Sequence, residues 1–237
     1  MGVGPGDPEL LTVAAVRAIQ AADLVAYPVA RPEAEGMAAT IAAPWIHPGQ
    51  ERLPLLFPMV VEAEPRRSAW RAAAASLASA VAAGRRVVLL CEGDVSLYAT
   101  ASYVLLALRR HHPDLPVRLI PGISAVAAAG AAAAFPLALH SEGLLIRPTP
   151  ESREALAELL EQAAAADWVL ALLKLGHRWA WVRPLLEQRG LLADALFAGR
   201  IGWPEQRLAP AIDLPAGEEP YFSLLLIRQG LPPVLPG

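Results

Sequence analysis

The sequence predicts an α/β protein built from two α/β domains. Short apolar runs of strand length alternate with alanine-rich helical segments along the first half of the chain. Near the carboxyl end, three strand-like runs follow one another with only turns between them. A length of 237 residues fits one large or two small domains. We therefore predict an N-terminal domain over residues 1–119 and a C-terminal domain over residues 120–237.

The first half of the chain has the pattern of β-α units around a mostly parallel sheet. Thr12 is placed to cap a helix that runs to about Ala22. Pro28 is expected to end the strand that follows this helix. The expected elements are a strand at 24–27, a helix at 65–83 closed by Gly84, a fully buried strand at 86–91, a helix at 96–110 and a strand at 117–120. Such alternation is typical of helices packed on parallel strands.

The second half of the chain changes character towards its carboxyl end. The expected elements are strands at 143–146 and 167–173, helices at 151–162 and 178–189, and strands at 194–200, 207–212 and 221–228. Consecutive strands without helices between them pair antiparallel. The second domain is therefore predicted to contain a mixed sheet.

The composition excludes several classes of protein. Hydrophobic residues make up 55% of the chain and charged residues 18%, so the chain can bury a full core. A net charge of −3 gives no electrostatic footprint for nucleic acid. Cys91 is the only cysteine, and the five histidines show no metal-ligand spacing, so we expect no metal.

A long uncharged run, residues 119–139, has the length of a membrane span. It consists mostly of alanine and glycine, and Pro121, Gly122 and Pro136 break it. We interpret it as buried helix and loop. Neither end carries the pattern of a secretory signal peptide, so a cytoplasmic protein that does not enter a membrane is expected.

The first residues form a glycine-rich loop in front of a helix. Gly2, Gly4 and Gly6 let the backbone approach a ligand closely, while Pro5 and Asp7 fix the turn. The spacing is neither the dinucleotide fingerprint nor a phosphate loop. An aspartate in the loop is compatible with a cationic or polyhydroxyl ligand. The alternative is a tight strand-to-helix turn without a ligand, and the loop alone favours neither.

Three further segments follow predicted strands, where open α/β sheets place their ligands. They are residues 92–94, 121–125 and 174–176. Lys174 is the only lysine among the 20 basic residues of the chain, which makes it a candidate ligand contact. The alternative is a lysine that simply lies at a strand exit.

Three motifs in order resemble those of the tetrapyrrole methylase family. They are residues 4–12 (GPGDPELLT), Glu92-Gly93-Asp94 with Tyr98, and residues 121–125 (PGISA). The resemblance covers nearly the whole chain. It implies a class III methyltransferase fold, with S-adenosyl-L-methionine bound in a cleft between two α/β domains. It also implies a tetrapyrrole substrate, a homodimer and a role in cobalamin and porphyrin biosynthesis.

Carried over position by position, the resemblance implies a set of site residues. The methyl donor would contact Pro5, Glu92, Gly93, Asp94, Leu97, Ser124, Ala125, Leu173 and the backbone near Ile201. Asp94 suits the ribose hydroxyls or the amino group of the donor. The substrate trough would include Gly4, Gly6 and Lys174, with Arg31, Arg178 and Arg200 binding the substrate carboxylates. Asp7 or Tyr98 is the candidate base.

The reaction implied by this resemblance needs positioning more than covalent catalysis. Holding a methyl donor in line with a nucleophilic carbon contributes up to roughly 7–11 kcal/mol. The sequence departs from the family pattern in three ways. Few residues precede the glycine loop, Val95 replaces a proline, and Leu173 replaces a methionine. The alternatives are another corrin-ring methylase, diphthine synthase, and a ligand-binding module of the same fold without catalytic activity.

Overall fold

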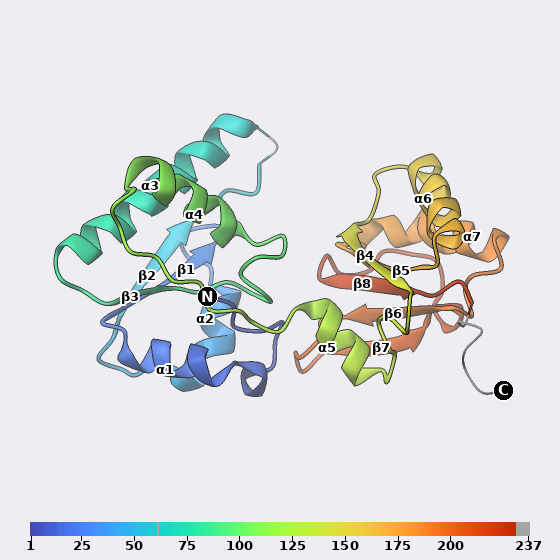
Figure 1. Cartoon of the computed structure of the whole chain (residues 1–237), viewed down its shortest axis with the longest axis horizontal. Coiled ribbons are helices and arrows are strands. Elements are labelled where there is room, and N and C mark those ends of the chain that lie inside the picture. The colour runs from blue at the N-terminus through green and yellow to red at the C-terminus, as the bar shows by residue number, and fades with distance from the viewer. Residues whose placement is uncertain (61, 231–237) are drawn as a thin grey trace. The chain divides into compact units, whose positions relative to one another are not determined.

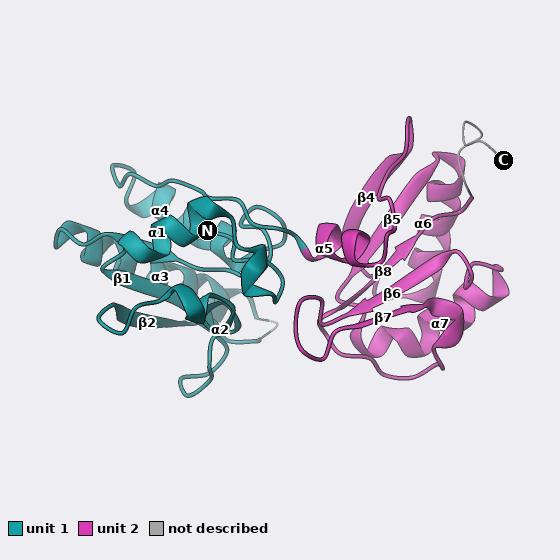
Figure 2. Ribbon diagram, turned by 90° about the horizontal axis from the view of Figure 1, so that it is seen from below, with its two compact units in different colours: residues 1–124 teal, residues 125–237 magenta. Residues whose placement is uncertain are grey.

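The chain forms two compact α/β units, which confirms the predicted fold class. The computed structural model describes residues 1–60 and 62–230. Unit 1 is Met1–Ser124 and unit 2 is Ala125–Gly237 (Figure 2). The predicted domain boundary, between residues 119 and 120, lies shortly before this division. Each unit has its own sheet.

The sheet of unit 1 is parallel, as predicted. Its order is β2-β1-β3, with β1 at Leu24–Val29, β2 at Glu51–Leu56 and β3 at Val87–Leu89. Helices α1 (Val13–Ala21) and α2 (Met37–Ala42) cover one face, and α3 (Ala63–Ala82) and α4 (Thr100–His111) cover the other (Figure 1). Short 3-10 turns occur at Pro8–Leu10 and Ala43–Trp45. The sequence analysis did not predict β2 or α2.

Caps and turns fix where the first helices begin. The Thr12 hydroxyl accepts a hydrogen bond from the Ala15 backbone N–H at 3.1 Å, which places the start of α1 as predicted. Asp7 caps the preceding 3-10 turn in the same way, accepting from the Glu9 N–H at 2.8 Å. α4 begins at Thr100 rather than at residue 96, because residues 92–99 form an irregular loop after β3.

The expectation that Pro28 ends β1 is wrong. The strand continues to Val29, whose carbonyl accepts a hydrogen bond from the Phe57 N–H at 2.9 Å. β3 pairs only with Leu24–Ala26, whereas β2 pairs along the whole of β1. Pro28 therefore lies beyond the part of β1 that has a neighbour on both edges, where a missing N–H is tolerated.

Two further predictions, one about residues 117–120 and one about β3, are also wrong. Residues 117–120 form no strand, and Val87–Leu89 are half-buried rather than fully buried. Met1 and Val3 instead bond to the end of β3, through Met1 N to Leu89 O at 2.7 Å and Val3 N to Cys91 O at 3.0 Å. Among the described residues no strand pairs with residues 117–120, and a segment forms a strand only beside a ladder partner.

Unit 2 contains the predicted mixed sheet. Its order is β4-β5-β8-β6-β7, and only β4 and β5 pair parallel. The strands are β4 at Gly143–Pro148, β5 at Trp168–Leu173, β6 at Ala195–Gly199, β7 at Arg207–Pro210 and β8 at Ser223–Ile227. The helices are α5 at Ala125–Ala132, α6 at Arg153–Ala165 and α7 at Trp179–Gln188, with 3-10 turns at Gly176–Arg178 and Ala211–Asp213.

The core of unit 2 lies between its sheet and the helices α6 and α7. Every residue of β8 is buried, because β8 lies at the centre of the sheet. Trp179 and Phe197 are fully buried, and their ring centroids lie 6.3 Å apart. The Trp179 indole N–H donates to the Pro215 carbonyl at 2.9 Å, so its one polar atom is satisfied.

The uncharged run at residues 119–139 contains α5, a helix of only 8 residues. Over residues 1–60 and 62–230, no helix has both the length and the apolar character required to cross a bilayer. The run is therefore helix and loop, as expected, but the expectation that it is buried holds only for part of it, because many of its residues are exposed.

Candidate functional site

The three glycine-containing motifs meet in unit 1 at the end of β3. Gly4 and Gly93 exchange two backbone hydrogen bonds, at 3.3 and 2.7 Å. A Cβ atom added to Gly2 would lie 2.4 Å from the Gly93 carbonyl oxygen, and one added to Gly122 would lie 2.3 Å from it. Only glycine permits this approach. Segments far apart in the sequence are thus brought into backbone contact.

The Asp94 carboxylate ties the second motif to the third. Its Oδ2 accepts from the Gly122 N–H at 2.8 Å, and its Oδ1 accepts from the Ser96 N–H at 2.9 Å and from the Ser96 hydroxyl. Burial opposes ionisation of Asp94, but these hydrogen bonds outweigh it and lower the pKa below its usual value. Both carboxylate oxygens already bond within the chain, so Asp94 holds the loops in place.

Glu92 lies beside the first turn of α2. Burial is the largest influence on this carboxyl group and raises its pKa, while the backbone N–H groups of Ala38 and of Glu92 itself oppose the rise. Ala38 belongs to the first turn of α2, whose N-cap residue, Gly36, has no side chain to accept its amide hydrogens. Glu92 therefore acts as an acceptor at this helix N-terminus.

The loop after β3 holds two residues in the left-handed region. Gly93 has a φ of 64°, and a Cβ added there would meet no atom within 4 Å. Tyr98 has a φ of 52°, an uncommon conformation for a bulky side chain that costs about 1–3 kcal/mol. Strain of this size is typical of functional loops, and Tyr98 is half exposed. Leu97 lies in the turn between them, with its N–H 3.4 Å from the Asp94 carbonyl.

The remaining predicted residues of unit 1 lie in two loops. Pro5, Gly6 and Asp7 belong to the loop in front of α1, where the carboxylate of Asp7 is a turn cap. Arg31 lies in the exposed loop after β1. Ser124 is the last residue of unit 1, and Ala125 begins α5.

A second group of predicted residues lies at one end of the unit 2 sheet. β5 and β6 both pair antiparallel with β8, so their carboxyl ends flank its beginning. Leu173 and Lys174 lie at the end of β5, and Arg200 and Ile201 follow β6. Lys174 and Arg200 have φ values of 57° and 46°, so both residues adopt the left-handed backbone conformation.

The sequence analysis assigned no role to the aromatic neighbour of Lys174. Its ammonium nitrogen lies 6.0 Å from the centroid of the Tyr221 ring, and the N–H of Arg200 donates to the Phe222 carbonyl at 2.8 Å. The position of Tyr221 and Phe222 just before β8 depends on the antiparallel pairing of β8 with β5 and β6.

Arg178 is engaged within the chain. Its guanidinium forms an ion pair with both oxygens of Glu151, at 2.6 and 2.5 Å, and donates to the Lys174 carbonyl at 3.3 Å. This guanidinium lowers the pKa of Glu151. Arg178 was predicted to bind substrate carboxylates. In this structure its guanidinium binds Glu151 and the backbone carbonyl of Lys174.

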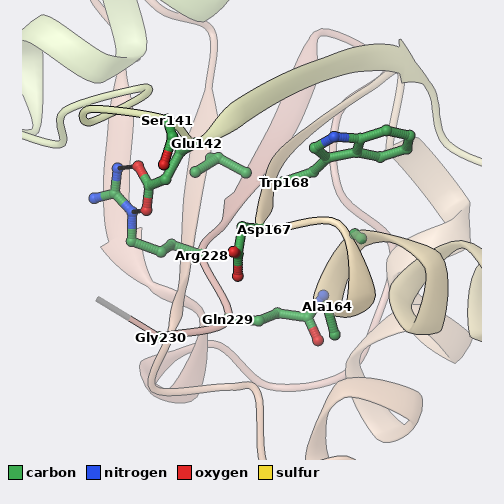
Figure 3. Close-up of a pocket in the computed structure, with 10 residues that line it drawn as sticks. Ser141, Glu142, Ala164, Asp167, Trp168, Arg228, Gln229 and Gly230 are labelled. Atoms are coloured by element: carbon green, nitrogen blue, oxygen red, sulfur yellow. Dashed lines mark hydrogen bonds and ion pairs between the residues drawn. The ribbon is translucent and has the colours of Figure 1, made fainter. Parts of the chain in front are cut away.

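A separate pocket of unit 2 contains a buried ion pair (Figure 3). Arg228 donates to the two oxygens of Glu142 at 3.1 and 2.9 Å, and to the Pro136 carbonyl at 2.8 Å. Both side chains are less than 10% exposed. The pocket lies at the beginning of β5 and beyond the end of β8, the opposite strand ends from Lys174. It contains none of the predicted site residues.

Comparison with known proteins first gives the class. The solved structure of the methyltransferase CobJ superposes with a TM-score of 0.68 at 26% identity, covering 96% of this chain and 91% of that one. The chain therefore has the fold of a methyltransferase. The sequence model of the Tetrapyrrole (Corrin/Porphyrin) Methylases matches residues 1–212. This chain belongs to the tetrapyrrole methylase family, as its three motifs predicted.

Curated relatives are similar over almost the whole of this chain. The Cobalamin biosynthesis protein CobIJ of Mycobacterium tuberculosis is 36% identical over 97% of this chain, which spans only 45% of that protein. The Precorrin-2 C(20)-methyltransferase of Sinorhizobium sp is 32% identical over 96% of this chain and 93% of its own length. The Cobalt-precorrin-2 C(20)-methyltransferase of Salmonella typhimurium is 28% identical, covering 97% and 94%.

Proposed function

We propose that this chain transfers a methyl group from S-adenosyl-L-methionine to C20 of precorrin-2 or cobalt-precorrin-2 in cobalamin biosynthesis. The observation that carries the proposal is the 32% identity to a precorrin-2 C(20)-methyltransferase over nearly the full length of both chains. The meeting of the three family motifs in unit 1 supports it. We also propose a cytoplasmic homodimer, on the family resemblance alone.

The residues at the motif junction fit a methyl donor of this kind. Adenosine and methionine groups need hydrogen-bonding backbone and little steric obstruction. Gly93 supplies an open, left-handed position for close approach, and Leu97 supplies apolar surface in the same loop. In this proposal Pro5, Glu92, Asp94, Ser124, Ala125, Leu173 and Ile201 complete the donor contacts.

The bound sulfonium supplies an electrophilic methyl group, so the chain mainly positions and shields the reactants. Holding donor and substrate carbon in line contributes up to roughly 7–11 kcal/mol. Gly4 and Gly6 line the substrate trough. Lys174, Arg200 and Arg31 bind the substrate carboxylates, and Arg178 does so only if it leaves Glu151.

Tyr98 and Asp7 remain the two candidates for removing a proton. Tyr98 has a strained backbone conformation, and the residue is about half exposed. Asp7 is a carboxylate whose Oδ1 atom accepts from the Glu9 N–H. Of these two, the strained position of Tyr98 favours it as a residue that faces substrate.

The test is to incubate the purified chain with S-adenosyl-L-methionine and precorrin-2, with and without cobalt, and to measure product mass. A gain of one methyl group on one of these substrates supports the proposal and identifies the preferred form. Donor binding without methyl gain on either substrate contradicts it, and favours another corrin intermediate or a module that only binds. A reaction without donor is the control for mass changes from oxidation of the substrate.

A further inference from the structure

The turn after β5 carries Lys174, the only lysine of the chain. Its φ of 57° lies in the left-handed region, which is uncommon for a residue with a Cβ atom. The residue is half-buried, and its ammonium nitrogen lies 6.0 Å from the centroid of the half-exposed Tyr221 ring. The position of this ammonium group therefore depends on what holds the turn.

The backbone on both sides of Lys174 is anchored to the neighbouring strands. The Leu173 carbonyl accepts from the N–H and from the hydroxyl of Thr149, just beyond β4, at 2.7 and 2.9 Å. The Leu175 N–H donates to the carbonyl of Ser223, at the start of β8, at 3.1 Å. These bonds hold the residues before and after Lys174, while the carbonyl of Lys174 itself bonds elsewhere.

The Lys174 carbonyl bonds to the guanidinium of Arg178. Its oxygen accepts from Nη1 at 3.3 Å. In an α-helix the backbone N–H of Arg178 would bond to this carbonyl, but here it donates to the Leu175 carbonyl at 3.0 Å, as in a 3-10 turn. The Arg178 side chain thus supplies a hydrogen bond that a helical backbone would have supplied.

Glu151 and burial fix the guanidinium in this position. Nη2 of Arg178 donates to both oxygens of Glu151, at 2.6 and 2.5 Å. The Arg178 side chain is only 16% exposed, and its Nε is the one buried side-chain nitrogen or oxygen without a hydrogen-bond partner among the described residues. An ion pair with the exposed carboxylate of Glu151 does not require this burial. The unpaired Nε costs free energy, and the same buried position brings Nη1 to the Lys174 carbonyl.

We propose that Arg178 is a positioning residue, which fixes the left-handed turn at Lys174 and so keeps the ammonium group beside the Tyr221 ring, where it binds a carboxylate of the substrate. The substrate in this statement rests on the proposed function, whereas the coupling of Arg178 to Lys174 does not. A side chain that is already held in place loses less freedom on binding, so a fixed turn strengthens binding of the carboxylate. Arg178 itself contacts no substrate in this arrangement, because Glu151 and the Lys174 carbonyl occupy its guanidinium.

The first test measures the position of the Lys174 ammonium group without substrate. Reductive methylation with carbon-13 formaldehyde labels the amine of Lys174 and the terminal amine, and the methylated lysine keeps its charge. In the NMR spectrum, Lys174→Arg identifies the lysine signal, and Tyr221→Leu gives its position without the ring current of the tyrosine. We expect Arg178→Gln to lose most of the shift that Tyr221→Leu removes.

Arg183→Gln is the matched control. The Arg183 side chain is buried to a similar degree and also donates to a carboxylate and to a backbone carbonyl. Its replacement should leave the Lys174 signal in place. Glu151→Ala removes the ion pair but keeps the arginine, and should lose part of the shift even where Arg178→Gln does not fold. A wild-type Lys174 signal in every folded variant of Arg178 and Glu151 would overturn the proposal, as would an equal loss of shift in Arg183→Gln.

The second test distinguishes positioning from direct contact with substrate. Methyl transfer is measured against precorrin-2 concentration for Lys174→Ala, Arg178→Gln and the double variant. We expect each single change to raise KM by a similar factor, roughly tenfold, with kcat and donor affinity unchanged, and the double variant to show no further rise.

Factors that multiply in the double variant would mean that Arg178 binds substrate itself, and would overturn the proposal. A fall in kcat at unchanged KM in Arg178→Gln would indicate a merely structural role and would overturn it as well. Absence of methyl transfer in the wild type would contradict the proposed function alone, because the NMR test still decides whether Arg178 positions Lys174.

Discussion

At the scale of single residues, the two acidic side chains of the second motif accept hydrogen bonds from other segments of the chain. Their residue types alone do not indicate this structural role. Asp94 accepts hydrogen bonds from Ser96 and from the Gly122 backbone, and Glu92 accepts from the first turn of α2. Each carboxylate satisfies backbone N–H groups that would otherwise lack a partner. A role in binding the methyl donor and a role in holding the loops therefore predict different effects of substitution.

Replacing Asp94 with alanine should reduce both stability and donor affinity. The change leaves the Gly122 and Ser96 N–H groups without their acceptor, at a cost of about 1–3 kcal/mol in the free energy of unfolding. Urea unfolding and calorimetric titration with S-adenosyl-L-methionine measure the two effects. Ser96→Ala is the matched control, because it removes only the hydroxyl bond to Asp94. Unchanged donor affinity in Asp94→Ala would remove this residue from the donor site.

Replacing Glu92 with glutamine should remove a pH dependence of stability. The pKa of Glu92 is raised in the folded chain, so the unfolded chain releases this proton first. Stability of the wild type should fall as pH rises from about 4.3 through the folded pKa, and then level off. Glutamine keeps an acceptor for the Ala38 N–H and cannot ionise. Urea unfolding from pH 4 to 8 should show Glu92→Gln gaining on the wild type as pH rises; a constant difference would contradict this.

At the scale of elements, strand assignment depended on partners that lie far away in sequence. Residues 117–120 have strand composition, yet form no strand, since a ladder needs a neighbour. β2 was missed because its six residues include Pro54 and several charged or exposed positions. Its parallel pairing along all of β1 compensates for this weak pattern.

The loop junction is the element most sensitive to added volume. In Gly122→Ala, the new Cβ would lie 2.3 Å from the Gly93 carbonyl oxygen and 2.8 Å from Gly2 backbone atoms, so backbone must move. We expect a loss of about 3 kcal/mol or more in the free energy of unfolding. Gly49→Ala is the matched control in the same unit, because its Cβ would meet nothing within 4 Å. Equal unfolding midpoints for the two variants would show that the junction is not closely packed.

Two of the ion pairs in unit 2, Arg228–Glu142 and Arg178–Glu151, should differ greatly in their importance. Glu142→Gln leaves the buried Arg228 without its charged partner and should cost about 3–5 kcal/mol in the free energy of unfolding. Glu151→Gln alters a pair whose carboxylate is 83% exposed, so a much smaller loss is expected. Urea unfolding of both variants tests this; similar losses would mean that burial does not decide the strength of these pairs.

At the scale of the whole molecule, the chain forms two units, and the residues of the proposed reaction are distributed over both. Unit 1 carries the three motifs, and unit 2 carries the cations at the ends of β5 and β6. This division separates two functions in the proposal. Donor binding depends mainly on the motif junction, and recognition of the substrate carboxylates depends on Lys174 and Arg200.

Lys174→Ala should therefore raise KM for the tetrapyrrole without changing donor affinity. The ammonium group lies near the Tyr221 ring and has no salt-bridge partner among the described residues, so its loss should leave the unit folded. Loss of one charge-assisted hydrogen bond predicts a rise in KM of roughly tenfold or more. The measurement is initial rate against precorrin-2 concentration, with a donor titration alongside. Tyr221→Phe, which keeps the ring, is the control; an unchanged KM in Lys174→Ala would remove this residue from substrate binding.

Local patterns determined much of this protein. Hydrophobic periodicity predicted the helices α1, α3, α6 and α7 and most strands, because these elements bury a regular face. Consecutive strands near the carboxyl end predicted antiparallel pairing. Strand-end reasoning holds for residues 92–94 and 174–176, which follow β3 and β5, but residues 121–125 follow no strand. The motifs themselves identified the family.

Only the tertiary structure decided what individual side chains do. The sequence presents Asp94, Glu92 and Arg178 as available charges, but each has partners that belong to segments distant along the chain. The same holds for residues 117–120, whose strand composition has no effect without a paired neighbour. Local pattern reports which face a segment buries, whereas hydrogen-bond partners and register depend on which segments fold against one another.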